Sequence, residues 1–308
     1  MSSDLAVFQE HRPTLLALAY RMVGEVGRAE DVVQTAWLRW QGRDTHVDNA
    51  RAYLIQIVTR LCLNELSSAR ARKEEARGSR LPEPVSLKDS GIARVEALDK
   101  ISMAFLVLLQ RLTPTERAVL LLHEVFDLEH HEIAAHVGKS AATCRQILKR
   151  AREHVLSGRR ALSVSGEAHR RLLHAFLRAA SSGDVAEVAK VLSDDVVLIA
   201  DAGLSGGTYG RVRNLPGPIV GRAKVAAFVA TVTPQGGSGL VVKECELNGQ
   251  PSALVLRDGR PYTAILLSVA DDQINGVFIH ADPARLGHVE ELGRADVADH
   301  RIEFRRRQ

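Results

Sequence analysis

Apolar residues recur at helical spacing through the first part of the chain. Leu15, Leu18 and Met22 share one face of a predicted helix that Gly24 ends. A second helix is predicted over residues 29–40, with Glu30 in its first turn, where acidic groups suit the helix dipole. Its buried side is expected to consist of Val32, Val33, Ala36, Leu38 and Trp40.

A longer helix is predicted to begin after Asn49, which is a good N-cap residue. Tyr53, Leu54 and Ile57 are expected in its core, together with Leu61 and Leu66. The opposite face is polar and mostly basic, and it can follow a phosphate backbone, while the neighbouring loop of residues 41–49 could hold unstacked bases. Arg51, Gln56, Arg60 and Asn64 lie on this polar face.

The helical pattern breaks over residues 78–94, which contain Gly, Ser and two prolines. This stretch predicts an extended linker, and its apolar start at Leu81 suggests that it docks on another part of the protein. Helical spacing resumes at Val95, and Thr113 followed by Pro114 marks the start of the next helix.

Residues 128–155 predict two short helices separated at Val137 and Gly138, with Ser140 as N-cap of the second. Cys144, Leu148, Ala151 and Val155 form one apolar stripe, and the other face is basic and rich in amides. This is the layout of a helix-turn-helix, whose second helix enters the major groove. From residue 138 to 160 there are seven Lys or Arg and one acidic residue, a pattern that fits either a DNA-reading helix or a solvated one.

The character of the chain changes after Gly166. Two helices, a strand-like segment, a glycine-rich loop and a further helix come first. From residue 240 to 280 the polarity alternates as in β-structure, with hairpin signals at Asn248-Gly249, Asp258-Gly259 and Asp271-Asp272. Helices followed by a meandering antiparallel sheet predict an α+β cone with an interior pocket.

Length and composition fit a soluble protein of two or three domains, since 308 residues are 45% hydrophobic and 25% charged. No apolar run approaches the roughly 20 residues that cross a bilayer, and the first residues lack a signal-peptide pattern. We therefore expect a cytoplasmic protein with no membrane partner. Residues 1–166 carry 24 basic and 20 acidic groups, whereas residues 167–300 carry 13 basic and 16 acidic groups. Residues 1–166 are therefore the part of the chain that is expected to face nucleic acid.

Metal and nucleotide sites are not expected. Cys62, Cys144 and Cys245 are far apart in sequence, which favours buried thiols over a disulfide or zinc framework. His131 and His136 are five residues apart, and a metalloprotease helix would need its second histidine at position 135. Gly138-Lys139-Ser140 lacks the earlier glycine and the preceding strand of a phosphate-binding loop. We predict neither a metal nor a cofactor.

Three blocks in order resemble a known family: AEDVVQTAWLRW, then NARAYLIQIVTRLCLNEL, then LTPTERAVLLLHEVFDLEHHEIAAHVGKSAATCRQILKRAR. They look like regions 2 and 4 of an extracytoplasmic-function (ECF) sigma factor. The predicted C-terminal cone resembles the SnoaL-like branch of the NTF2-like superfamily. Sigma factors with such a fused domain form a group often called ECF41 or SigJ-like. The predicted fold is thus multidomain, with two all-α sigma domains followed by an α+β NTF2-like cone.

Three short motifs of that group are found in this chain, each with a difference in sequence. The linker motif, WLPEP in relatives, is here Arg80-Leu81-Pro82-Glu83-Pro84. A DGGGK-type motif appears only as Asp201-Ala202-Gly203, without its basic end, and an NPDKL-type motif appears as residues 281–286, which include Asp282 and Pro283. The expected domains are residues 1–77 for region 2, 78–94 for the linker, 95–160 for region 4, 167–290 for the cone and 291–308 for a basic tail.

The resemblance implies a promoter-recognition subunit of RNA polymerase that works by binding alone. Polymerase clamp helices of the β′ subunit would bind Asp31, Gln34, Leu38 and Arg39, and the β flap would bind region 4. The melted −10 strand would be held by the loop of residues 41–49 and by Asn49, Arg51, Gln56, Arg60 and Asn64. The −35 element would be contacted through Ser140, Thr143, Arg145, Gln146, Lys149 and Arg150, of which Arg150, with Arg152, would meet phosphates.

The C-terminal cone has more than one interpretation. It could regulate in cis by packing on the linker through Leu81, Pro82, Glu83 and Pro84, with Asp201, Gly203, Asp282 and Pro283 on the cone side. It could instead sense a small ligand in its pocket, or it could be an enzyme using Asp201, Asp282 or His280 as acid or base. A last alternative is a helix-turn-helix repressor that binds duplex DNA without polymerase.

Overall fold

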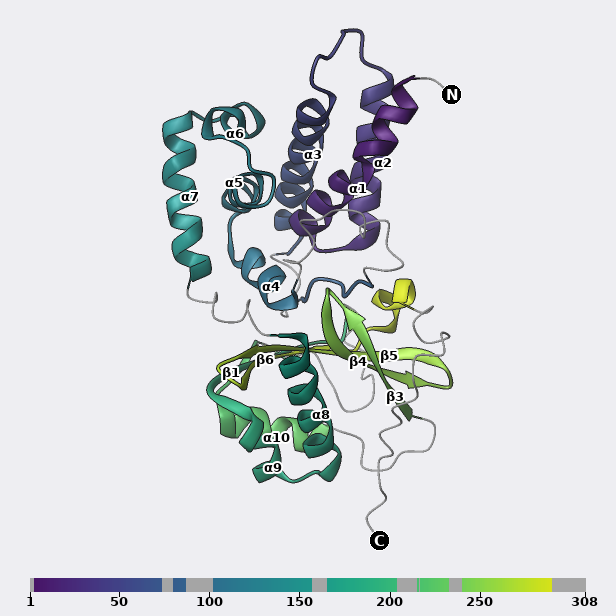
Figure 1. Ribbon diagram of the computed structural model, residues 1–308, viewed down its shortest axis with the longest axis vertical. Coiled ribbons are helices and arrows are strands. Elements are labelled where there is room, and N and C mark those ends of the chain that lie inside the picture. Colours follow the sequence, from purple (N-terminus) through teal and green to yellow (C-terminus); the bar gives the residue numbers. More distant parts are fainter. Residues whose placement is uncertain are drawn as a thin grey trace. The chain divides into compact units, whose positions relative to one another are not determined.

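The computed structural model describes residues 3–73, 80–86, 102–156, 165–203, 215, 217–232 and 240–289 (Figure 1). The chain forms two compact units. Of the described residues, the first unit holds 3–73 and 105–156, and the second holds 80–86, 102–104 and everything from 165 onwards. The predicted helix start at Val95, most of the glycine-rich loop and the basic tail of residues 291–308 lie outside the described residues.

The first unit is all-α. Its helices are α1 (Ser3–Val23), α2 (Val26–Gln41), α3 (Ala50–Lys73), α4 (Met103–Arg111), α5 (Pro114–Glu124), α6 (His130–Val137) and α7 (Ala141–Leu156). α1 packs against α2 and α3, and α5 packs against α6 and α7; α3 also contacts α5 and α6. The predicted apolar stripe of the last helix is confirmed, because Cys144, Leu148, Ala151 and Val155 are all buried.

The predicted caps of these helices are confirmed. The side chain of Asn49 accepts a hydrogen bond from the Ala52 amide at 3.0 Å. Thr113 forms a capping box with Glu116, and Ser140 Oγ accepts from the Thr143 amide at 3.1 Å. Gly138 ends α6 in the left-handed conformation, with φ of 66°, which a residue without Cβ adopts at no steric cost. These local signals fix where each helix begins and ends.

Two details of α2 differ from the prediction. The helix begins at Val26, after an extended N-cap at Glu25, so Glu30 lies in its second turn. Gly24, with φ of 77°, makes the sharp turn out of α1, and Gly27 is accommodated as an ordinary helical residue. Leu38 is 61% exposed, whereas Val32, Val33, Ala36 and Trp40 are buried as expected. Helical rotation from Trp40 carries Leu38 to the solvent side, because a separation of two residues is about 200°.

The second unit is α+β. It contains α8 (Gly166–Ser182), α9 (Val185–Val191), β1 (Leu192–Asp201), β2 (Ile219–Val220), α10 (Arg222–Val232), β3 (Leu240–Leu247), β4 (Gln250–Arg257), β5 (Arg260–Ala270), β6 (Gln273–His280), and the 3₁₀ turns η3 (Pro283–Arg285) and η4 (Gly287–Val289). The six strands form one sheet in the order β2-β1-β6-β5-β4-β3.

The sheet is mixed, and it contains the antiparallel meander that was predicted for residues 240–280. β3 to β6 form an antiparallel meander, and β1 pairs in parallel with β6, with Asp201 opposite His280. Three tight hairpins join the meander, so the free edge of β6 is open to a strand from earlier in the chain. The predicted hairpin turns are confirmed, since both turn residues have positive φ at Asn248-Gly249, Asp258-Gly259 and Asp271-Asp272.

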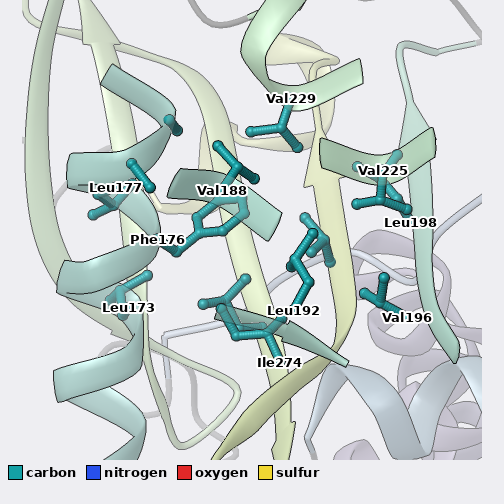
Figure 2. Close-up of a cluster of buried hydrophobic side chains, with 14 of the residues drawn as sticks. Leu173, Phe176, Leu177, Val188, Leu192, Val196, Leu198, Val225, Val229 and Ile274 are labelled. Carbon is teal, nitrogen blue, oxygen red and sulfur yellow. The ribbon is translucent and has the colours of Figure 1, made fainter. Parts of the chain in front are cut away.

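α8, α9 and α10 cover one face of this sheet (Figure 1). Leu173, Phe176 and Leu177 of α8 meet Val188 of α9 and residues of the sheet such as Ile274 (Figure 2). The cluster is apolar throughout and supplies the main hydrophobic stabilisation of the unit. The predicted fold class, all-α helical regions followed by an α+β domain, is confirmed.

Among the described residues, no helix combines the length and the apolar character of a membrane-spanning segment.

Candidate functional site

The second helix of the helix-turn-helix presents a polar, basic face to solvent. All six residues predicted to contact the −35 element are exposed: Ser140, Thr143, Arg145, Gln146, Lys149 and Arg150. The hydroxyls of Ser140 and Thr143 lie 2.8 Å apart at the N-terminus of α7, where backbone amides favour a phosphate. Arg152 instead pairs with Glu124 of α5, with Nε 2.7 Å from Oε1. That pair ties α7 to α5 and orients the exposed face.

A cleft of about 720 Å³ lies between α2, the loop that follows it, and α3. Two of the predicted −10 residues, Gln56 and Arg60, line this cleft. The other three, Asn49, Arg51 and Asn64, are outside the described lining; Asn49 caps α3, and Arg51 and Asn64 are exposed on it. The full lining is Thr35, Leu38, Arg39, Gly42, Arg43, Asp44, Thr45, Tyr53, Gln56, Ile57 and Arg60.

Arg43 fixes the loop beside the cleft. Its guanidinium lies over the Trp40 ring, 3.5 Å from the centroid, and donates to the Trp40 carbonyl at 2.6 Å. It also pairs with Asp4 of α1 at 2.5 Å, and the Trp40 indole donates to the Asp4 carbonyl. The start of the loop is therefore held to both α1 and α2.

The chemistry of the cleft suits a single nucleic-acid strand. Arg39, Arg43 and Arg60 bring three positive charges and Asp44 one negative charge, while Tyr53 adds an aromatic ring. Guanidinium groups neutralise phosphates and stack on bases, and aromatic rings stack on any base. Tyr53 was not predicted as a site residue, and Arg43 was predicted only as part of the loop of residues 41–49. The available signal was an aromatic residue and an arginine flanking a polar loop, but Tyr53 also fitted the helix core.

The residues predicted to bind polymerase form one exposed face of α2. Asp31, Gln34, Leu38 and Arg39 are all exposed, and their spacing places them along one side of the helix. Leu38, 61% exposed, is the apolar centre of this face. An exposed leucine flanked by charged and amide groups is typical of a protein-binding surface with a polar rim.

The linker docks in the second unit through a buried ion pair. Asp201 and Arg285 are 4% and 6% exposed, and Arg285 Nη1 lies 2.5 Å from Asp201 Oδ2. The same carboxylate oxygen accepts from the Leu81 amide at 2.9 Å, and Arg285 Nη2 donates to the Leu81 carbonyl at 2.8 Å. Arg285 Nε also lies 3.3 Å from Glu83. Asp201, Arg285, Leu81 and Glu83 are called the linker clamp below.

Further contacts extend the docking along the linker. The Val85 amide donates to Asn248 Oδ1 at 3.1 Å, and the Asn248 amide donates to the Val85 carbonyl at 2.8 Å. The His288 ring contacts the Pro84 carbonyl at 2.5 Å. Leu81 and Val85 are essentially inaccessible to solvent, and Pro82 and Pro84 are buried. The apolar start of the linker therefore docks on the cone, as its composition predicted.

The three acid–base candidates of the cone have structural partners or are inaccessible. Asp201 accepts from the Gly203 amide at 3.0 Å in addition to the clamp contacts. Asp282 caps η3, which Pro283 begins, by accepting from the Ala284 amide at 3.1 Å. His280 is 1% exposed, and burial beside Arg285 and His288 holds its pKa well below the ordinary range. This arrangement favours a structural role for both carboxylates.

Substitution of Gly203 is expected to weaken the cone where its two motifs meet. Gly203 has φ of +86°, and an added Cβ would lie 2.4 Å from Asp282 Oδ2. Gly203→Ala should lower the free energy of unfolding by about 2 kcal/mol, from the left-handed conformation and a disturbed cap. Urea denaturation measures it, with Gly287→Ala, which meets nothing within 4 Å, as the control. Equal stability of the two variants would contradict this.

The three cysteines are buried, as predicted. Burial raises the pKa of the Cys62 thiol and of the Cys144 thiol, and it raises the pKa of Cys245 to about 12. Each thiol therefore stays protonated and poorly reactive at neutral pH.

Known proteins contain the same two helical regions in the same order. Residues 7–72 match the model for sigma-70 region 2, and residues 102–155 match sigma-70 region 4. The chain is 32% identical over 299 residues to the probable ECF RNA polymerase sigma factor SigI of Mycobacterium tuberculosis, covering 94% of this chain and 97% of that protein. It is 34% identical over 243 residues to SigJ of the same species, covering 77% and 75%.

The likeness extends to a solved structure. The crystal structure of M. tuberculosis SigJ superposes with a TM-score of 0.71 at 27% identity, covering 92% of this chain and 98% of that one. The match covers both the helical part and the C-terminal α+β domain, so the resemblance to a SigJ-like sigma factor inferred from the sequence is confirmed. The chain belongs to the extracytoplasmic-function family of RNA polymerase sigma factors.

Proposed function

We propose that this chain directs the bacterial RNA polymerase core to specific promoters, and that its C-terminal cone regulates this activity in cis. The observation that carries the proposal is that one compact unit bears two different cationic surfaces. One is a helix-turn-helix with an exposed basic helix, and the other is a cationic cleft with an aromatic wall. A duplex and a single strand need such different surfaces.

Region 4 would read the −35 element as duplex. Thr143, Arg145, Gln146 and Lys149 lie near the front of α7 and would reach base edges, while Arg150 would contact phosphates. Ser140 would place the helix N-terminus against a phosphate. Arg152 is held by Glu124 and would act by orienting the helix.

Region 2 would capture the melted −10 strand. Unstacked bases would enter the cleft lined by Tyr53, Gln56 and Arg60, and Asn49, Arg51 and Asn64 would bind the strand along α3. Stacking and phosphate neutralisation would offset part of the cost of melting the duplex. The proposed mechanism is binding without covalent chemistry.

The polymerase core would bind the exposed face of α2. Asp31, Gln34, Leu38 and Arg39 would meet the β′ clamp helices, with Leu38 as the buried centre of the contact. The β flap would bind region 4. Polymerase and promoter DNA are thus the expected partners, and the protein would act in the cytoplasm.

The cone would regulate by holding the linker. Leu81 and Glu83 dock on Asp201 and Arg285, and the Pro84 carbonyl contacts His288. Asp282 caps the neighbouring η3 turn, which Pro283 begins, and Gly203 lies close to the Asp282 side chain. A linker held at these contacts cannot take another path until they break. Because Asp201 is engaged in this docking and Asp282 caps η3, regulation is favoured over catalysis for the cone.

Reconstituted transcription tests the proposal. With core polymerase and a genomic promoter library, Gln146→Ala should reduce transcription from preferred promoters by about 5- to 150-fold and change which promoters are preferred, since one bidentate base contact is worth about 1–3 kcal/mol. Glu153→Ala, at an exposed position of the same helix, is the matched control. Promoter-specific transcription that is the same for both variants would contradict the −35 assignment.

A further inference from the structure

Regions 2 and 4 are packed against each other within the first unit, through a buried arginine. Arg117 of α5 is 7% exposed. Its Nε donates to the Leu109 carbonyl at 2.8 Å, and its Nη1 donates to the Met22 carbonyl at the end of α1. Desolvation lowers the pKa of Arg117 to about 10, so the group stays charged at neutral pH. The charge is solvated by helix-end carbonyls of both regions, which favour a cation.

A second contact joins α3 to α6. Gln56 Nε2 and Arg60 Nη2 both donate to the Ala135 carbonyl, at 3.1 Å and 3.2 Å. Ala135 lies in the last turn of α6, which ends at Val137. Carbonyls in the last turn have no partner further along the helix and carry its negative pole. The Ala135 carbonyl is therefore a good acceptor for these two donors.

These same donors line the cleft that was assigned above to the −10 strand. A donor that is bound to Ala135 cannot at the same time bind a base or a phosphate in its best geometry. We propose that, in the polymerase-free chain, α6 and a single strand of DNA compete for Gln56 and Arg60, so that region 4 restrains region 2 and −10 DNA releases region 4. The identity of the competing ligand rests on the proposed function; the restraint itself rests on the contacts of Arg117, Gln56 and Arg60.

His136 is expected to oppose the contact between α3 and α6. The side chain is 6% exposed, next to Ala135, and neither ring nitrogen has a hydrogen-bond partner among the residues that the structure describes. Burial and the charge of Arg60 lower its pKa, so the ring is held neutral. A buried imidazole without partners costs free energy, which separation of α6 from α3 would recover by hydration. The closed state is thus stabilised by Arg117 and opposed by His136.

The restraint uses residues of the first unit only. It therefore differs from the linker clamp, which lies entirely in the second unit. Loosening the clamp should leave the Arg117 and Ala135 contacts in place. A single strand that enters the cleft should break them, because the coupling between strand binding and region 4 packing is reciprocal.

The test uses the full-length chain with two fluorescent labels. Glu30→Cys on α2 and Glu153→Cys on α7 give exposed labelling sites, and the three native thiols are buried with raised pKa values. The probe is a single-stranded oligonucleotide with the non-template −10 sequence of a promoter that the chain transcribes. We expect energy transfer between the labels to fall when the oligonucleotide binds.

Arg117→Met should open the contact without DNA. It removes both hydrogen bonds but retains an unbranched apolar stem, so energy transfer should be low from the start. The affinity for the oligonucleotide should rise about tenfold, within the 5- to 150-fold range of typical coupling. The control is Arg28→Met, since Arg28 pairs only with Glu25 and Glu65 of region 2 among the ion pairs of the described residues. Its affinity should stay within twofold of the parent.

The outcomes separate the restraint from the proposed function. If the labelled parent transcribes its promoter but neither DNA nor Arg117→Met changes the energy transfer, the restraint is wrong and the function stands. If promoter-specific transcription is absent, the function fails, and the Arg117→Met change without DNA still decides the restraint. Should Arg117→Met unfold, which circular dichroism reveals, the DNA-induced change in the parent decides.

Discussion

Replacing Arg285 with methionine is expected to lower the free energy of unfolding by about 3–5 kcal/mol, because it leaves the buried Asp201 carboxylate without its cation. Both side chains are almost inaccessible to water, and Arg285 also donates to the Leu81 carbonyl and lies against Glu83. Urea denaturation of the full chain measures the loss. The amides of Leu81 and Val85 should exchange with solvent faster, since the docked linker protects both.

Two comparisons make this result specific. Arg171→Met removes an exposed ion pair with Asp272 in the same unit and should cost less than about 1 kcal/mol. The double variant Asp201→Asn with Arg285→Met should be more stable than the sum of the single effects implies, because no unpaired buried charge remains. A loss below 1 kcal/mol for Arg285→Met would show that the pair does not hold the linker. A changed promoter-dependent transcription in this variant would connect the clamp to regulation.

The features predicted correctly from the sequence are those with local causes. Asn49, Thr113 and Ser140 cap helices because their side chains reach amides only two or three residues away. The hairpin turns follow from Asn, Asp and Gly, which tolerate positive φ. The polar face of α7 follows from a 3.6-residue period alone. In each case the residues that decide the structure are neighbours in the chain.

The features that were missed depend on partners far away in sequence. Arg285 stands within a motif, but its role depends on Asp201 and Leu81, which are 84 and 204 residues away. The parallel pairing of β1 with β6 depends on which edge the meander leaves open. Tyr53 was expected in the core, because a helix face that lines a cleft has the same apolar spacing as one that lines a core. Leu38 was assigned to the buried side although it fitted a binding surface.

Acidification is expected to destabilise the chain through His169 of α8. The side chain is 3% exposed, and desolvation lowers its pKa from 6.5 to about 4. The unfolded chain therefore takes up a proton below about pH 6.5, whereas the folded chain does so only near pH 4. Stability is fully present above pH 6.5 and falls as the pH drops through this interval, by about 3 kcal/mol in total for this one group.

His169→Leu isolates this contribution, because leucine fills much of the same space and does not titrate. The difference in unfolding free energy between parent and variant should change by about 3 kcal/mol from pH 7 to pH 4, in favour of the variant as the pH falls. The buried His136 and His280 also have lowered pKa values and titrate in both proteins, so their contributions cancel in the difference. Parallel stability curves for the two proteins would show that His169 is hydrated or paired in solution, and that the sheet-facing core extends less far along α8 than its burial implies.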